Sequence, residues 1–219
     1  MYGKKIVSPI GNMGFIVFLL IFPHLVPLPF YSYADVCFVA IYLMLRWDGR
    51  SFSDIDLKKE KITFRAILLG FITAVAWVAF MQLFYIPGIK FIFQVPDYSE
   101  YNFIRSSLTR LLMTLVAAVL IGGFYEEVAI RGYIQNVLEQ KILKKYSPLI
   151  SMFTTSLLFG LYHIQQDVFA IFSAFLGGLY WAILCRKFHN LWIPIFSHAL
   201  FDSITLILIY KGVFGLFNY

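Results

Sequence analysis

Apolar residues along this chain gather into seven long windows that polar segments separate. A helix needs about 20 predominantly apolar residues to cross a bilayer, and each window comes close to that length, although the second is short. Pro23, Pro27 and Pro29 predict that the first span is bent or irregular. The pattern therefore predicts about seven membrane-crossing helices. The windows cover about residues 14–30, 33–46, 64–86, 108–138, 148–166, 168–185 and 190–210.

The composition favours a membrane protein over a soluble one. Of the 219 residues, 60% are hydrophobic and only 14% are charged, whereas a soluble domain carries about a quarter charged residues. One small core cannot hide so much apolar surface, so a bilayer is its natural solvent. We predict an all-α fold, a polytopic transmembrane helical bundle. Residues 1–107 supply N-terminal helices and a loop, and residues 108–219 form the core of the same integrated domain.

Basic residues cluster between the apolar windows, and the net charge is +6. Lys and Arg mark the cytoplasmic connections of membrane proteins, so these clusters predict a cytoplasmic N-terminus. The abundance of Phe, Ile, Lys and Tyr is typical of an AT-rich genome and favours a bacterial plasma membrane. No basic stripe is interleaved with polar surface, so no nucleic-acid partner is predicted. The connections predicted to be cytoplasmic are Arg46–Arg65, Lys141–Lys145 and Arg186–Asn190.

Six ionisable residues interrupt the apolar windows of the C-terminal half. A charged residue at a bilayer centre costs about 2.5–3.5 kcal/mol or more, so each needs a partner or a function. Glu126 and His163 flank one basic turn at similar distances, about 25–30 Å along their helices. His198 lies about 15 Å beyond the next basic turn, so all three converge near the middle of the membrane. The six are Glu126, Glu127, Arg131, His163, His198 and Asp202.

Spacing within the helices predicts two pairs among these residues. Glu127 and Arg131 are four residues apart, share a helix face and can form an ion pair. Glu126 points about 100° away from Glu127 and stays free for another role. His198 and Asp202 are also four residues apart and present to one site. A structural alternative stays open, in which the two pairs satisfy themselves and the remaining histidine packs in a core.

Three short motifs occur in order on these spans: EEVAIR (126–131), FGLYH (159–163) and HALFD (198–202). Together they resemble the motifs of the CPBP intramembrane proteases, a family of type II CAAX prenyl endopeptidases and bacteriocin-processing enzymes. The resemblance covers about residues 108–205, and it implies that residues 108–219 are the catalytic core. The last motif position is often Asn in the prenyl endopeptidase branch. It is Asp202 here, and this departure weighs against CAAX processing.

The resemblance implies a membrane-embedded endopeptidase that uses water as the nucleophile. Glu126 would be the base, His163 would share the water, and His198 with Asp202 would position or stabilise the tetrahedral oxygen. A second mechanism stays open, in which Glu126, His163 and His198 hold a divalent metal such as zinc. The chain has no His-Glu-x-x-His motif. The supporting motif positions are Glu127, Arg131 and Phe159.

Two other classes of function remain open at this point. Proteins of such a family can protect a cell from its own bacteriocin as catalytically silent immunity or binding proteins. Intramembrane Glu, His and Asp also build transporters and proton channels, although the chain lacks the paired repeats of many transporters. For an endopeptidase, the expected partners are the lipid bilayer and a peptide or lipidated protein substrate. The substrate would be a prenylated C-terminus, a bacteriocin leader or a pheromone precursor.

Overall fold

The computed structural model describes residues 7–26, 28, 32–92 and 101–213, and every regular element in these ranges is helical. The predicted all-α bundle is thus confirmed. Short helices η2 (Phe52–Ile55), η3 (Lys59–Lys61) and α5 (Asn102–Arg105) lie in the connections. The longer elements are α1 (Pro9–Leu25), α2 (Ser32–Trp47), α3 (Phe64–Phe80), η4 (Met81–Tyr85), α4 (Ile86–Ile92), α6 (Leu108–Ala117), η6 (Ala118–Glu126), η7 (Val128–Gln135), η8 (Leu138–Ile142), α7 (Pro148–Tyr162), α8 (Val168–Phe188) and α9 (Trp192–Tyr210).

Four helical segments are long and apolar enough to cross a membrane. The apolar helices α1 and α7 are shorter, so the number of about seven crossings stays a prediction. Large apolar side chains point outward along these helices, and Phe64 and Phe91 are 80% and 91% exposed. Such a surface is suited to lipid and not to water. The four long segments are Phe64–Ile92, Leu108–Ile142, Val168–Phe188 and Trp192–Tyr210.

Polar residues that precede the apolar runs explain where several helices begin. Ser8, Thr63 and Asp167 each accept a hydrogen bond from a backbone N–H in the first turn of α1, α3 and α8. This side-chain cap satisfies a donor that has no partner within the helix. Ser147 caps α7 in the same way, and Pro148 follows at the first helical position, where its missing N–H costs nothing.

Two helix ends differ from the sequence-based expectation. The third apolar window ends at about residue 86, but the third span continues through Pro87 to Ile92. The wider π-helical turn η4 ends at Tyr85, two residues before Pro87, and such turns accommodate the ring and the missing N–H of proline. The fifth window extends to residue 166, but α7 ends at Tyr162 and His163 is its C-cap residue.

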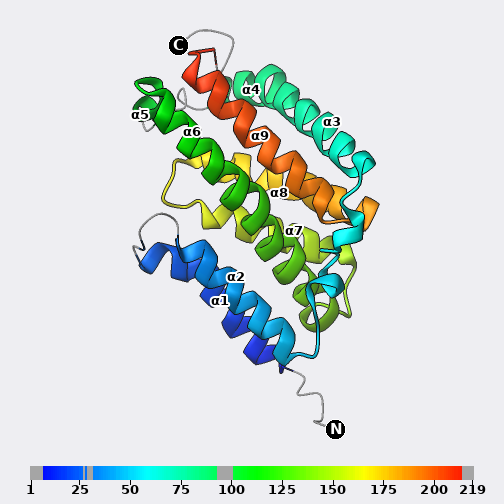
Figure 1. Cartoon of the computed structure of the whole chain (residues 1–219). Coiled ribbons are helices and arrows are strands. Elements are labelled where there is room, and N and C mark those ends of the chain that lie inside the picture. The colour runs from blue at the N-terminus through cyan, green and yellow to red at the C-terminus, as the bar shows by residue number, and fades with distance from the viewer. Residues whose placement is uncertain (1–6, 27, 29–31, 93–100, 214–219) are drawn as a thin grey trace.

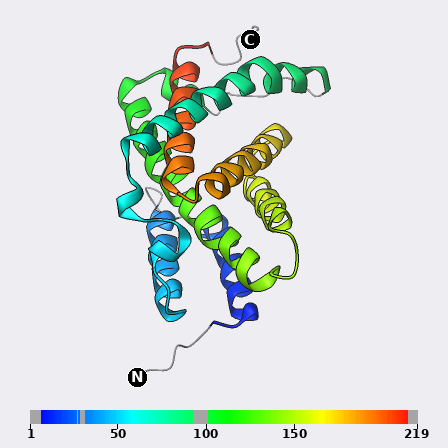
Figure 2. The same ribbon diagram turned by 90° about the vertical axis from the view of Figure 1, so that its right-hand side faces the viewer.

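The segment Leu108–Ile142, called the long helix below, is the axis of the bundle. It lies between α2 and α9, and α3 packs on the far side of α9 (Figure 1). The α7–α8 hairpin lies behind this row in Figure 1 and to the right of the long helix in Figure 2, and both of its helices contact η7. The long helix therefore touches the elements that carry all the other candidate residues.

Most of the long helix is π-helical, which sequence periodicity does not predict. After α6, the segments η6, η7 and η8 have i→i+5 hydrogen bonding. Gly123 lies in η6 against α9, and a Cβ there would be 2.4 Å from Cβ and 2.8 Å from Cα of Ala199. Only glycine allows the two helices to approach so closely at this point. Single π-turns within helices are uncommon and are frequent at functional sites.

The three basic connections lie together at one end of the bundle. Asn190 Nδ2 donates to the Lys61 carbonyl oxygen at 3.1 Å, and Lys61 Nζ contacts the His189 carbonyl oxygen. Lys141 at the end of the long helix forms an ion pair with Asp48. A shared side is what the charge pattern predicts for these connections. That this side is cytoplasmic stays a prediction.

Candidate active site

A cavity of about 610 Å³ lies between the long helix, α3, α7, α8 and α9. Glu126, His163, His198 and Asp202 all line it, although they come from three segments that are distant in the sequence. The cavity wall continues from these polar residues over apolar ones such as Trp77. The structure therefore brings the four predicted catalytic residues together in one cavity, most of whose other lining residues are apolar.

Glu127 lies behind the cavity wall, fully buried, and joins two of the predicted groups. Its Oε1 is 3.1 Å from Nη1 of Arg131 and 2.8 Å from Nδ1 of His198. The ion pair with Arg131 follows from the i,i+4 spacing. The bond to His198 joins residues 71 positions apart, and helical spacing cannot predict it. Glu127 therefore also orients a cavity histidine, besides balancing the arginine.

His198 is held by its Nδ1 and turns its other ring nitrogen to Asp202. Because a carboxylate can only accept, Nδ1 donates the hydrogen bond to Glu127. Nε2 lies 3.6 Å from Oδ2 of Asp202, just beyond hydrogen-bonding distance. A protonated His198 can therefore donate from both nitrogens, one toward Glu127 and one on the side of Asp202.

His163 ends α7 and is oriented by its own helix. Its Nδ1 lies 2.9 Å from the carbonyl oxygen of Phe159, which accepts the hydrogen bond. A neutral His163 therefore carries its proton on Nδ1 and keeps the lone pair of Nε2 free. The Phe159 ring packs edge-on against His163, with centroids 4.9 Å apart. His163 is thus ready to accept a hydrogen bond from a molecule in the cavity.

Glu126 differs from its neighbour in having no such partner. Within the described ranges, no hydrogen bond or ion pair engages its carboxylate, and Glu126 lines the cavity. The adjacent glutamate, Glu127, is turned into the protein and carries both the arginine and the histidine. The two side chains therefore separate as predicted, one into the cavity and one into the wall.

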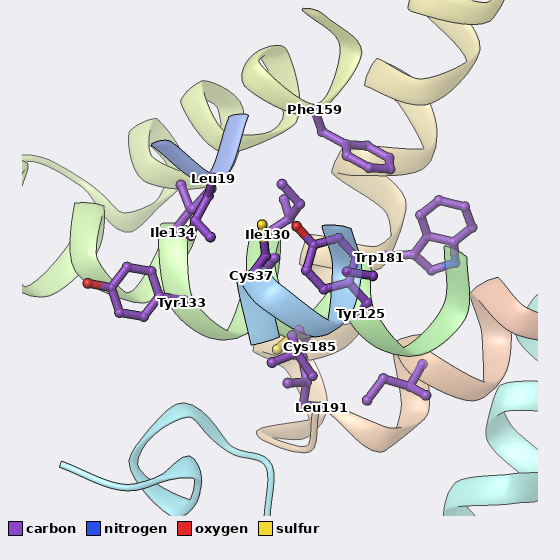
Figure 3. Packing of buried hydrophobic residues seen from close by; sticks show 14 of the residues in the cluster. Leu19, Cys37, Tyr125, Ile130, Tyr133, Ile134, Phe159, Trp181, Cys185 and Leu191 are labelled. Carbon is purple, nitrogen blue, oxygen red and sulfur yellow. The ribbon is translucent and has the colours of Figure 1, made fainter. Parts of the chain in front are cut away.

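Aromatic rings and a glycine complete the wall around the charged groups. The Arg131 guanidinium lies 4.5 Å from the ring centroid of Phe159 and 5.6 Å from that of Trp181. Figure 3 labels both rings, Phe159 on α7 and Trp181 on α8. A Cβ on Gly122 would lie 2.3 Å from Oδ2 of Asp202, so only glycine leaves that carboxylate its position. The three motifs do not include Trp181 or Gly122, and their roles depend on contacts between separate helices.

The positions of the side chains around the cavity also bear on the hypothesis that the site binds zinc. Its three candidates, Glu126, His163 and His198, all line the cavity. In the part of the chain that the structure describes, no group of three or more His, Cys, Asp and Glu side chains is arranged to hold a metal ion. As placed, the three candidates do not form a metal-ligand set.

Residues 108–204 match a family model, that of the type II CAAX prenyl endopeptidase Rce1-like family. The matched segment begins with the long helix and includes every residue of the three motifs. Among curated proteins and solved structures, none matches this chain significantly. The family predicted from the motifs is therefore confirmed, and residues 108–204 of this integral membrane protein are an Rce1-like domain of the type II CAAX prenyl endopeptidases.

Proposed function

We propose that this protein is an intramembrane endopeptidase that hydrolyses a peptide bond with a water molecule activated by Glu126. The observation that carries the proposal is the unpartnered carboxylate of Glu126 beside two oriented histidines in one cavity. A general base must reach the water without being engaged elsewhere. Glu126 is the carboxylate of the EEVAIR motif that meets this condition, because Glu127 is already bound to Arg131 and His198.

Hydrolysis proceeds through two proton transfers at Glu126. The carboxylate takes a proton from water, and the water oxygen forms a bond to the carbonyl carbon while the C=O electron pair moves onto oxygen. The protonated Glu126 then gives the proton to the amide nitrogen as the oxyanion electron pair re-forms C=O and the C–N bond breaks. The products are a carboxylic acid and an amine, which become a carboxylate and an ammonium ion when the acid proton passes to the amine, so atoms and charges balance without an added reactant.

The two histidines have different roles because their hydrogen bonds differ. His163 donates from Nδ1 to its own helix, so its free Nε2 accepts from the water and aligns it with Glu126. His198, when protonated, donates from Nδ1 to Glu127 and directs its Nε2 proton toward the oxygen of the tetrahedral intermediate. Preorganised donors of this kind lower the barrier of acyl transfer. Asp202, 3.6 Å from Nε2, stabilises the protonated ring.

The surroundings of the cavity favour a substrate that is itself associated with the bilayer. Apolar residues, among them Trp77, Phe169 and Leu206, also line the cavity. Apolar helices surround it, so a lipid-embedded segment can approach from the side. A prenylated C-terminus, a bacteriocin leader and a pheromone precursor all have the required apolar character. An immunity protein that only binds a bacteriocin remains the alternative.

The proposal is tested by cleavage of fluorescence-quenched peptides with an apolar anchor by the protein in lipid nanodiscs. Substitution Glu126→Gln keeps the size of the side chain but removes the base, and it should reduce turnover by about 10²–10⁴-fold. The matched control is Glu139→Gln on the same helix, which removes a partly exposed ion pair with Arg186 far from the cavity motifs. Its turnover should stay within about twofold of wild type.

Two results would contradict the proposal. Turnover by Glu126→Gln close to that of wild type would show that another group is the base. Binding of a bacteriocin peptide by wild type and Glu126→Gln alike, with no cleavage of any peptide, would favour the immunity protein instead.

A further inference from the structure

Trp181 makes the closest ring contact around the candidate site. It lies on α8, outside all three motifs, and is 2% exposed. Its indole is stacked on the imidazole of His198, with centroids 3.6 Å apart and ring planes at 19°. The indole N–H donates to Oγ of Ser197, the residue before His198, at 3.3 Å. Trp181 is therefore fixed to α9 at two adjacent residues.

The stack supplies a restraint that the hydrogen bonds of His198 do not. A single hydrogen bond at Nδ1 leaves the imidazole free to tilt about that nitrogen. The flat contact with Trp181 covers one face of the ring, and the Phe159 ring stands perpendicular to it at 6.1 Å. The ring plane is then set, and with it the direction in which Nε2 faces the cavity. An indole face also attracts a protonated imidazole through its quadrupole.

Gly177 leaves the space that the indole occupies. It lies one helical turn before Trp181 on α8, and a Cβ there would be 2.8 Å from Cζ3 of the indole. That atom belongs to a buried ring, which cannot swing away as the end of a flexible side chain can. An alanine at 177 would therefore displace the indole without deleting it.

We propose that Trp181 is a positioning residue for the hydrolytic reaction, because its indole holds the His198 imidazole with Nε2 directed at the oxygen of the tetrahedral intermediate. This inference rests on the function proposed above. Trp181 acts through His198, so its loss should affect the chemical step more than substrate binding. Misplacement of a reacting group by about 1 Å costs up to about 100-fold in rate.

Kinetics with the same peptides test the inference. Trp181→Leu should lower kcat by about 10- to 100-fold and leave KM within about twofold. Trp181→Phe retains a flat ring and should recover part of the lost kcat. The control is Trp192→Leu, which removes an indole that donates to the Lys58 carbonyl oxygen and does not line the cavity. Its kcat should stay near that of wild type.

A spectroscopic measurement reports the stack independently of turnover. The chain has four histidines, so the imidazole signals of histidine-labelled protein can be resolved by NMR and His198 assigned with His198→Gln. The indole ring current should shift the His198 ring protons upfield. Trp181→Leu should abolish this shift, Gly177→Ala should reduce it together with kcat, and Trp192→Leu should preserve it.

The outcomes separate this inference from the proposed function. No cleavage by wild type overturns both. Cleavage that depends on Glu126 while Trp181→Leu keeps the wild-type kcat overturns the inference alone, as does an unshifted His198 signal in wild type. If Trp181→Leu fails to fold, Gly177→Ala is the variant to measure, because it retains the indole. A Gly177→Ala variant with the wild-type kcat, although its His198 NMR signal has lost the upfield shift, would overturn the inference.

Discussion

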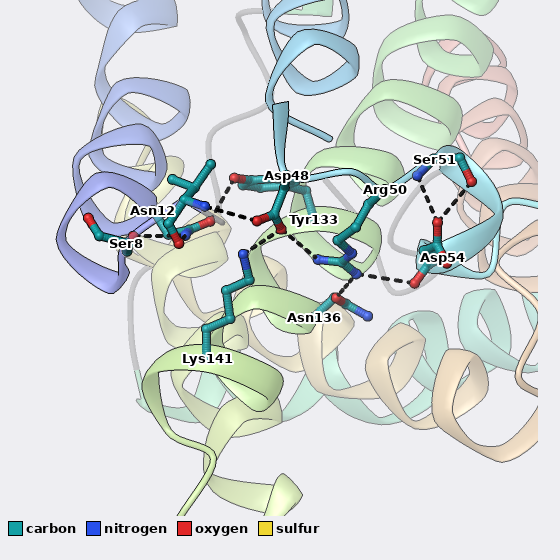
Figure 4. A network of polar contacts seen from close by, with 10 residues as sticks. Ser8, Asn12, Asp48, Arg50, Ser51, Asp54, Tyr133, Asn136 and Lys141 are labelled. Atoms are coloured by element: carbon teal, nitrogen blue, oxygen red, sulfur yellow. Dashed lines mark hydrogen bonds and ion pairs between the residues drawn. The ribbon is translucent and has the colours of Figure 1, made fainter. Parts of the chain in front are cut away.

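The long helix contributes residues to two clusters of polar side chains, and the clusters differ in how fully their hydrogen-bonding groups are satisfied. The loop-side network includes Ser8, Asn12, Asp48, Arg50, Ser51, Asp54, Tyr133, Asn136 and Lys141 (Figure 4). The intramembrane cluster consists of Glu126, Glu127, Arg131, His163, His198 and Asp202. Both contain carboxylates with basic partners.

In the loop-side network, each carboxylate is engaged by several donors. Asp48 forms an ion pair with Lys141 and accepts from the backbone N–H of Val7 at 3.1 Å. Asp54 accepts from the backbone N–H of Ser51 at 2.7 Å, and this bond lowers the pKa of the Asp54 carboxyl below its usual value. These groups join α1, α2 and the long helix, and they leave no carboxylate free to act on another molecule.

The intramembrane cluster is incompletely satisfied, although it is the costlier place to leave polar atoms unpaired. Oε2 of Glu127 and both Nη atoms of Arg131 are buried without a hydrogen bond, so Arg131 is held by charge and by the Phe159 ring. Glu126 faces the cavity with no partner at all among the described residues. Buried polar groups that lack partners require an explanation, and the catalysis proposed above would supply one here. The two clusters thus differ as an architectural network differs from the proposed catalytic one.

Arg131→Met should produce the largest loss of stability. The substitution keeps a long side chain over Phe159 but leaves the Glu127 carboxylate, which is fully buried, without its cation. Stranding one partner of a buried ion pair costs about 3–5 kcal/mol. The free energy of unfolding, measured by denaturant titration in micelles, should fall by that order, and turnover should fall with it.

The double variant Glu127→Gln/Arg131→Met sharpens this result. It removes both charges, so its stability loss should be smaller than the sum of the two single losses. Turnover should stay low, because a neutral amide at position 127 no longer fixes a charged His198. A purely additive double variant would show that the pair is not coupled.

The next largest effects are expected at two adjacent glycines, where one substitution should mainly lower stability and the other should mainly lower activity. Gly123→Ala pushes a methyl group into the α9 backbone, since its Cβ would lie 2.8 Å from Cα of Ala199. Overpacking of this kind costs about 1–3 kcal/mol. Gly122→Ala meets only the movable Asp202 carboxylate, at 2.3 Å from Oδ2. It should cost less stability than Gly123→Ala but lower turnover, and equal stability losses would contradict the distinction.

The loop-side network should give the smallest effect. Asp48→Asn removes the ion pairs with Lys141 and Arg50 while keeping a hydrogen-bond acceptor for Val7. A hydrogen bond to a charged group contributes about 1.5–3 kcal/mol, and we expect a loss at the low end of that range. Turnover in the peptide assay should remain close to that of wild type. A tenfold loss of turnover would show that the network is not merely architectural.

Sequence reasoning predicts much of this molecule because lipid imposes simple rules. Apolar windows of membrane-spanning length indicate the helices. The windows predicted from residues 64 and 168 begin where α3 and α8 begin, directly after the caps Thr63 and Asp167 that the structure shows. Ionisable residues in such windows are costly, so Glu126, His163 and His198 stand out without any structure. The i,i+4 rule also predicts the pair of Glu127 with Arg131.

What the sequence does not predict depends on contacts between distant segments and on departures from regular helix. The hydrogen bond from His198 to Glu127 and the stack of Trp181 on His198 require α8 and α9 to be placed against the long helix. The π-helical turns leave no clear periodic signal. In the sequence alone, Trp181 cannot be distinguished from the other apolar residues of its membrane span, because its neighbours on α9 are not known.

The central claim is that the two adjacent glutamates have different tasks, and one paired measurement tests it most directly. Glu126→Gln and Glu127→Gln are purified side by side, and thermal unfolding and peptide turnover are measured on the same preparations. We predict that Glu126→Gln loses turnover and unfolds at the wild-type temperature, because its carboxylate has no partner to lose. Glu127→Gln should unfold at a clearly lower temperature and lose activity as well, because it leaves the buried Arg131 guanidinium without its carboxylate partner. Retained turnover in Glu126→Gln, or an equal loss of stability in both variants, would contradict the account.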